Sequence, residues 1–234
     1  MAAPPQREAR RAAALICPDG AGQAGLDPAG EGRERKWSGW KEGGQTMQNG
    51  PEWFNSLGTE TSPGTKVFAV AGKGRMSGVV EIEMGTTVRE VLDDIADGIK
   101  EGNELKAVQL GGASGSFITG DNLDIPVDYD VMKEKGIGMG AGGFIIIDET
   151  TCMVDLVRHL MEFMHTESCG KCIPCREGTG RMLEILESVI RKPVSEDSGT
   201  TLERFKGVMQ LETIASVMRD TSLCGLGQTA RNHF

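Results

Sequence analysis

Four of the six cysteines have a spacing that predicts an iron-sulfur site. Cys169, Cys172 and Cys175 form a C-x2-C-x2-C run, and Cys224 follows after 48 intervening residues. Such a run lets one tight loop offer three thiolates to three irons of a [4Fe-4S] cluster, while the fourth thiolate comes from elsewhere in the chain. We therefore expect these four cysteines to hold a cluster of this type and to pass electrons through it.

The residues around the cysteine run suit an anionic cluster. Gly170 and Gly178 permit a close backbone approach, and Pro174 stiffens the loop between two of the cysteines. Three basic side chains are expected to place positive charge nearby, which favours the reduced state, namely Lys171, Arg176 and Arg181.

Two other interpretations of the cysteines compete with this one. A structural zinc site also uses four cysteines, but usually as two separated CxxC pairs. Two disulfides would suit a short secreted chain with a signal peptide, and neither property is found here. A zinc-stabilised module that docks a protein partner stays as the alternative. Cys152 opens a predicted apolar helix face and is expected to be a packed thiol rather than a ligand.

A literal G-x-G-x-x-G occurs at Gly138, Gly140 and Gly143. A dinucleotide-binding fingerprint needs a strand before it and a helix after it, whereas strand-like residues follow here. We therefore expect a flexible loop at this position.

The histidines and acidic residues predict no catalytic site. His159, His165 and His233 share no spacing typical of a ligand set, and we expect them at the surface or in the core. His165 lies four residues before Cys169, which leaves a role in tuning the cluster open. Since no isolated pair of acidic residues is visible, we expect no catalytic residue in this chain.

The composition restricts the classes of partner. The 234 residues carry a formal net charge of -9, so no overall positive field attracts nucleic acid. No apolar run approaches the roughly 18 residues that suggest a membrane span, so we expect no direct membrane insertion. Three cysteines within seven residues indicate metal chemistry in a reducing compartment, so we expect a cytoplasmic setting, with any membrane association made through a partner complex. Residues 1–48 contain few large apolar side chains and are expected to be disordered.

The middle of the chain predicts a small α+β unit. Residues 66–72 and 78–85 have the composition of strands, and the second alternates Val80, Ile82 and Met84 with glutamates. A helix capped by Thr86 or Thr87 is expected over 88–99, followed by strands at 106–110 and 142–148. This order suits a β-grasp-like fold.

Beyond residue 148 the apolar period becomes helical, which predicts a small all-α bundle around the cysteines. The expected helices are 152–165, 181–192 and 201–220, with Thr200 or Thr201 capping the last. Their expected core stripes are Met153, Leu156, Val157, Leu160 and Met164; Met182, Ile185, Leu186 and Val189; and Leu202, Phe205 and Met209.

From about residue 49 the chain resembles the NADH-binding flavoprotein (F-type) subunit of NADH dehydrogenase complex I and its relatives in NAD(P)-reducing hydrogenases and formate dehydrogenases. The likeness is carried by NGPEWFNSLGTE, GTKVFAVAGK, MGTTVREV, the stretch from IIIDETTCMVDL to ESCGKCIPCREG, and DTSLCGLGQTA. By this resemblance, Cys169, Cys172, Cys175 and Cys224 match the cluster ligands of the family, and the chain transfers electrons between subunits of a dehydrogenase or hydrogenase complex.

The resemblance also implies a domain plan. Residues 1–48 are unrelated to the family, 49–65 are a remnant linker from a flavin domain, 66–147 are a β-grasp (SLBB-like) domain, and 148–234 are a helical [4Fe-4S] domain truncated at its C-terminus. FMN and NAD(P)H are expected for the full-length family but not for this chain, because the motifs that bind them belong upstream. The expected partners are other iron-sulfur subunits, and a non-functional truncated fragment is a further alternative.

Overall fold

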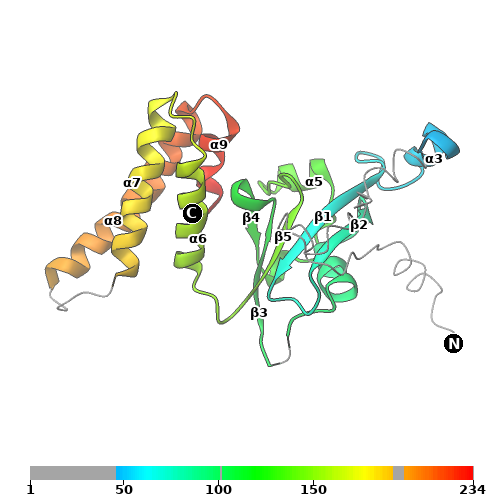
Figure 1. Ribbon diagram of the computed structural model, residues 1–234, viewed down its shortest axis with the longest axis horizontal. Helices are drawn as coiled ribbons and strands as arrows, with labels where there is room; N and C mark the ends of the chain where they lie inside the picture. The colour runs from blue at the N-terminus through cyan, green and yellow to red at the C-terminus, as the bar shows by residue number, and fades with distance from the viewer. Residues whose placement is uncertain (1–45, 101, 192–197, 234) are drawn as a thin grey trace, which may run out of the picture.

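The structure is a computed structural model, and it describes residues 46–100, 102–191 and 198–233. A five-stranded mixed sheet with short helices comes first, and a group of longer helices follows it, so the fold combines α and β structure in separate parts (Figure 1). We call residues 65–148 the sheet region and residues 153–233 the helical region. The expectation of disorder for residues 1–48 lies almost wholly outside the described residues.

The sheet has the strand order β2-β1-β5-β3-β4. Its strands are β1 (Thr65–Gly72), β2 (Gly78–Glu83), β3 (Leu105–Leu110), β4 (Ser116–Ile118) and β5 (Gly143–Asp148). β1 and β5 are parallel, whereas the other neighbouring pairs are antiparallel. The four predicted strands are therefore present within one or two residues at each end, and β4 is an additional short strand.

Alternating side chains of β2 build the core of the sheet region, as predicted. Val80, Ile82 and Met84 are all buried. Thr87 caps the following helix α4 (Val88–Glu90) through a capping box, in which its hydroxyl accepts from the N–H of Glu90 and the Glu90 carboxylate accepts from the N–H of Thr87. The chain continues as a π-helical turn, η1 (Val91–Ile95), so that apolar side chains of both elements face the sheet.

A buried carboxylate fixes the segment before β1 to the sheet region. Asp128 is 1% exposed and caps α5 (Tyr129–Glu134), where it accepts from the N–H groups of Asp130 and Val131. The same carboxylate accepts hydrogen bonds from the hydroxyls of Thr59 and Thr61. These bonds, with that of Thr59 the strongest influence, hold the pKa of Asp128 well below its usual range. Residues 59–61, which follow the short helix α3 (Pro51–Asn55), are thereby held against α5.

The two glycine-rich stretches pack backbone against backbone. A Cβ atom at Gly140 would lie 2.3 Å from the carbonyl oxygen of Gly111, and one at Gly143 would lie 2.9 Å from the nitrogen of Gly112. Gly143 is already the first residue of β5, so no helix follows the G-x-G-x-x-G. The motif is thus a loop and not a dinucleotide fingerprint, as predicted. Glycine is needed at Gly140 and Gly143 because a larger side chain would collide with the neighbouring backbone.

The helical region contains α6 (Met153–Thr166), α7 (Ile173–Ile190), α8 (Ser198–Thr221), the short α9 (Gly225–Gln228) and the 3-10 turn η4 (Thr229–His233). Its core is a second hydrophobic cluster, separate from that of the sheet region, made of Val157, Met161, Met164, Met182, Ile185, Leu186, Leu211, Ala215, Met218 and Ala230. The predicted stripe of α7 lies in or against this core. That of α6 does so only in part, since Val157 and Met164 belong to the core together with Met161, whereas Met153, Leu156 and Leu160 do not.

The predicted stripe of α8 is wrong. Leu202, Phe205 and Met209 are 52%, 64% and 57% exposed, and the opposite face of the helix carries the buried residues. Gly207 lies on the buried face, where its Cβ position is 3.1 Å from the Ile185 side chain of α7. Among the described residues, no element covers the outer face with Leu202, Phe205 and Met209, since all three side chains are more than half exposed. The helix also begins at Ser198, before the predicted caps Thr200 and Thr201.

The end of the described chain joins the helical region to the sheet region. Within η4, the side-chain amide of Asn232 donates to the carbonyl of Ser114 at 3.0 Å, and Nε2 of His233 donates to the carbonyl of Ala113 at 2.7 Å. The ring of Phe117, on β4, meets the His233 ring edge to face at a centroid distance of 5.9 Å. Phe117 also packs against the helical core. The glycine-rich turn after β3 is thus a docking point for η4.

Within the part of the chain that the structure describes, no helix combines the length and the apolar character that crossing a membrane requires.

Candidate metal centre

Two chain segments carry the four cysteines at the same end of the helical region. The loop between α6 and α7 contains Cys169, and α7 begins with Cys172 as its N-cap and Cys175 in its first turn. Cys224 is the N-cap of α9, which follows directly after α8. The loop and α9 lie together at the top of the helices in Figure 1. The loop that carries the cysteine run is therefore shorter than the sequence predicted, because Cys175 already belongs to α7.

Local sequence explains why the chain turns into α7 at this point. Pro174 stands in the first turn of α7, where its missing N–H costs nothing and its fixed φ suits a helix. Gly170 has a φ of 70°, a backbone conformation that glycine adopts without strain. The Arg176 guanidinium donates to the carbonyl of Gly170 at 3.1 Å and so holds the loop against the helix.

The thiol of Cys172 receives backbone hydrogen bonds from both segments. The N–H of Leu223, next to Cys224, donates to its sulfur, and so does the N–H of Cys175. The bond from Leu223 is the main reason that the pKa of Cys172 lies below the usual thiol value. The N-terminus of α7 favours the thiolate in the same way. Cys172 is thus prepared to act as a thiolate ligand.

Cys175 occupies the inner side of the site. It is 4% exposed, and burial raises the pKa of its thiol. Negative charge on Cys172 and Cys224 would raise this pKa further. The hydroxyl of Ser168 lies 3.3 Å from the sulfur of Cys175. A bound cation would reverse the effect of burial, because a coordinating thiol loses its proton outright.

The start of α9 packs directly on Cys175. A Cβ atom at Gly227 would lie 3.1 Å from the Cβ of Cys175 and 2.3 Å from the hydroxyl oxygen of Ser222. Ser222 is 6% exposed, and its hydroxyl has no hydrogen-bond partner among the described residues. A buried hydroxyl without a partner is costly, so an acceptor such as a cluster sulfur fits this position. The residues present therefore suit an iron-sulfur group.

Cys169 is exposed and stands in the loop before α7, three residues before Cys172. Among the residues that the structure describes, no three His, Cys, Asp or Glu side chains converge in the way that one metal ion requires. A [4Fe-4S] cluster does not need such convergence, because each thiolate binds a different iron.

Two of the three basic residues predicted to act on the cluster are engaged with carboxylates. Arg181 pairs with Glu184 at 2.8 Å, and Arg176 pairs with Glu177 at 2.9 Å in addition to its bond with Gly170. Lys171 is exposed on the loop itself. Positive charge does lie beside the cysteines, but the contribution of Arg181 and Arg176 is partly balanced by neighbouring carboxylates.

Cys152 is not the packed thiol that the sequence predicted. It is exposed, because it is the N-cap of α6 and lies just outside the helix whose apolar face it was expected to begin. The thiol therefore faces solvent before the first helical turn. This position leaves Cys152 as a matched exposed cysteine for comparison with Cys224.

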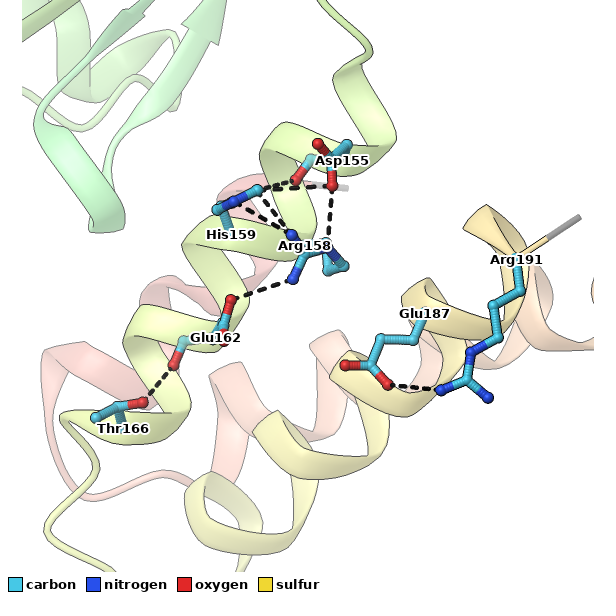
Figure 2. A network of polar contacts seen from close by, with 7 residues as sticks. All are labelled: Asp155, Arg158, His159, Glu162, Thr166, Glu187 and Arg191. Atoms are coloured by element: carbon cyan, nitrogen blue, oxygen red, sulfur yellow. Dashed lines mark hydrogen bonds and ion pairs between the residues drawn. The ribbon is translucent and has the colours of Figure 1, made fainter.

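The histidines of α6 take different roles. His159 belongs to an exposed polar network with Asp155, Arg158 and Glu162 along the outer face of α6 (Figure 2), in which its Nδ1 lies 2.9 Å from the carbonyl of Asp155. The ring of His165 lies 3.0 Å from the hydroxyl of Thr179.

Thr179 connects His165 to the backbone of a cysteine. Its hydroxyl donates to the carbonyl of Cys175 at 2.7 Å. Within the described part of the chain, His165 is therefore linked to the main-chain carbonyl of Cys175 through Thr179, and not to the sulfur. His233 is buried in the contact with the sheet region, as described above.

Three residues of the site, Ser168, Ser222 and Gly227, were not expected from the sequence. The first two precede cysteines by one or two residues, in SC and SLC, and this proximity is a signal that could have identified them. Gly227 follows Cys224 in CGLG, where a second glycine after a ligand is compatible with close packing.

Comparisons with known proteins agree with this geometry. Residues 155–234 match the family described as the NADH-ubiquinone oxidoreductase-F iron-sulfur binding region. Over 184 residues, 79% of the chain, it is 41% identical to the NADP-reducing hydrogenase subunit HndC of Solidesulfovibrio fructosivorans and 35% identical to an F-type subunit of the NADH-quinone oxidoreductase of Rhizobium meliloti. These matches cover 36% and 42% of the two relatives, so the chain spans well under half of their length.

A solved structure has a similar fold over most of this chain. The air-oxidized NAD+-reducing [NiFe]-hydrogenase matches 81% of this chain and 30% of its own chain, with a TM-score of 0.66 and 27% sequence identity. Residues 155–234 of the chain are thus similar to the NADH-ubiquinone oxidoreductase-F iron-sulfur binding region.

Proposed function

We propose that Cys169, Cys172, Cys175 and Cys224 bind one [4Fe-4S] cluster and that the chain is an electron-transfer module. The observation that carries this proposal is the packing of α9, whose N-cap is Cys224, on Cys175 of α7, where a Cβ atom at Gly227 would lie 3.1 Å from the Cβ of Cys175. When bound, the cluster accepts and releases one electron at a time. The chain itself supplies thiolates, backbone donors to sulfur and a partly buried setting.

The wider setting is also a proposal. The relatives are named as subunits of NADH-quinone oxidoreductase and NADP-reducing hydrogenase, so the module would serve an NAD(P)H-linked dehydrogenase or hydrogenase complex. Other iron-sulfur subunits of such a complex are the partners that fit. The five described cysteines are free thiols, which suits the reducing cytoplasmic side.

We further propose two domains, a β-grasp (SLBB-like) domain over 66–147 and a helical cluster-binding domain over 148–234. Two separate hydrophobic clusters support this division, one in the sheet region and one in the helical region. The contacts of η4 with the turn after β3 would then hold the two domains together.

Anaerobic reconstitution of the full chain with iron and sulfide tests the cluster. We expect a brown protein with about four irons and four sulfides and an EPR signal after reduction. The alternative, a zinc-stabilised interaction module, predicts a colourless protein with one tightly bound zinc and no such signal. That result would reject the proposed function.

A pair of exposed cysteines tests the choice of the fourth ligand. Cys224→Ser should lose the cluster or convert it to a form with less iron, because one iron loses its thiolate. Cys152→Ser, at an exposed N-cap away from the site, should keep the iron and sulfide content of the unmodified chain. The reverse pattern would show that the wrong fourth ligand was chosen.

A further inference from the structure

The hydroxyl of Ser168 contacts two groups, the backbone N–H of Gly170 and the sulfur of Cys175. The hydrogen-bonding properties of these two groups determine whether the hydroxyl donates or accepts in each contact. Its oxygen accepts a hydrogen bond from the backbone N–H of Gly170 at 3.3 Å. The same oxygen lies 3.3 Å from the sulfur of Cys175. Since the N–H of Gly170 can only donate, the oxygen acts as its acceptor, and the hydroxyl proton stays available for the sulfur.

The ionisation state of Cys175 determines which group donates in the contact between Ser168 and Cys175. A thiolate has no proton and can only accept. When Cys175 is ionised as a ligand, the contact is therefore an O–H to S bond in which Ser168 donates. Cys175 is 4% exposed, and in such a setting little water competes for its sulfur.

We propose that Ser168 is a positioning residue that raises the reduction potential of the site by donating a hydrogen bond to the sulfur of Cys175. This inference rests on the proposed function, since it needs a cluster on Cys175. Reduction adds negative charge that spreads onto the sulfurs, and a donor to sulfur stabilises this charge more in the reduced state than in the oxidised state.

Ser168 differs from the other donors around the cysteines in one useful respect. The main donor to Cys172 is the backbone N–H of Leu223, which no side-chain substitution removes. The donor to Cys175 is a side-chain hydroxyl, so one substitution deletes it while the thiolate stays in place. Ser168→Ala removes the hydroxyl, and Ser168→Thr keeps it.

Ser188 provides a matched control on α7. Its hydroxyl donates to the carbonyl of Ile185 at 2.8 Å, near the other end of the helix from the cysteines. Ser188→Ala therefore removes a serine hydroxyl from α7, the helix that carries Cys175, without removing a contact to any cysteine.

The experiment uses the full chain reconstituted anaerobically in all four forms. Iron and sulfide content, the EPR spectrum and the midpoint potential from an EPR-monitored redox titration are measured for each. We expect Ser168→Ala to keep its cluster but to be reduced less readily, by a factor of roughly three to ten in the equilibrium constant. A tenfold change corresponds to a potential lower by about 59 mV for one electron. Ser168→Thr and Ser188→Ala should titrate like the unmodified chain.

Each outcome has a definite meaning. An unchanged or higher potential in Ser168→Ala, with a full cluster, overturns the inference, and so does an equal shift in Ser188→Ala. If Ser168→Ala loses its cluster, Ser168→Thr decides: retention with an unchanged potential supports a role for the hydroxyl, whereas loss in both variants overturns it. Absence of any cluster in the unmodified chain would reject the proposed function itself, which separates the two failures.

Discussion

Gly227 lies against Cys175, so the short helix α9 is seated on a candidate ligand of the site. A Cβ at Gly227 would come 3.1 Å from the Cβ of Cys175 and 2.7 Å from the Cβ of Ser222. The contact brings the segment that carries Cys224 onto the helix that carries Cys172 and Cys175. We therefore expect the close packing at Gly227 to help bring the two cysteine segments together.

Gly227→Ala should separate these segments. The added methyl group overpacks the contact, and we expect a loss of roughly 1–3 kcal/mol in the free energy of unfolding. The iron bound per chain after reconstitution should fall as well. Gly225→Ala is the matched control, because nothing lies within 4 Å of its Cβ position, and it should leave both quantities nearly unchanged. Equal iron binding by the two variants would contradict the proposed seating of α9.

The glycines of the 138–143 loop should behave as packing residues. Gly140 and Gly136 both have positive φ, 51° and 70°, so alanine at either position costs about 1–2 kcal/mol in backbone strain. Only at Gly140 would the methyl group also meet a backbone atom, the oxygen of Gly111. We expect Gly140→Ala to be less stable than Gly136→Ala by roughly 1–3 kcal/mol in denaturant unfolding. Equal losses of unfolding free energy in the two variants would mean that the close contact of residue 140 with the Gly111 oxygen does not contribute to stability.

The parts of the fold that follow a simple apolar period were predictable from the sequence. Val80, Ile82 and Met84 alternate with glutamates and are buried, and Thr87 caps the helix as its sequence indicates. The short β4 was missed because three residues provide too few alternations to define a strand.

Two errors have physical causes that a single sequence does not reveal. α8 carries apolar residues on both sides, so its period permits two stripes, and only packing against α7 selects the one with Leu211 and Met218. The helix predicted over 181–192 in fact begins at Ile173, as α7. The start was missed because the spacing of the cysteines follows no apolar period. The four candidate ligands could be chosen from their spacing alone. The contact of Ser168 with Cys175 could not, since it depends on how the loop folds back onto α7.

The junction between the two regions should weaken in mild acid. Burial lowers the pKa of His233 below 6.5, so the folded chain binds fewer protons at this residue than the unfolded chain does. Stability from this residue is therefore complete above about pH 6.5 and is lost as the pH falls. We expect the free energy of unfolding to drop between pH 7 and 5 by more than it does in His233→Gln, which cannot be protonated.

The exposed His159 provides the comparison for this effect. Its ring lies on the solvent-facing side of α6, so His159→Gln should retain the pH dependence of the unmodified chain. A pH dependence that survives in His233→Gln would place its origin at another group. Chemical denaturation at a series of pH values measures all three forms.

The two apolar faces of α8 should differ in their contribution to stability. Met218 is 1% exposed in the helical core, and Met218→Ala should lower the free energy of unfolding by roughly 2–5 kcal/mol through the cavity it leaves. Phe205 is 64% exposed, and Phe205→Ala should change it by no more than about 0.5 kcal/mol. Urea unfolding followed by circular dichroism measures both. A large loss of unfolding free energy in Phe205→Ala would mean that the outer face of α8 is covered in solution. It would support the predicted core stripe of Leu202, Phe205 and Met209.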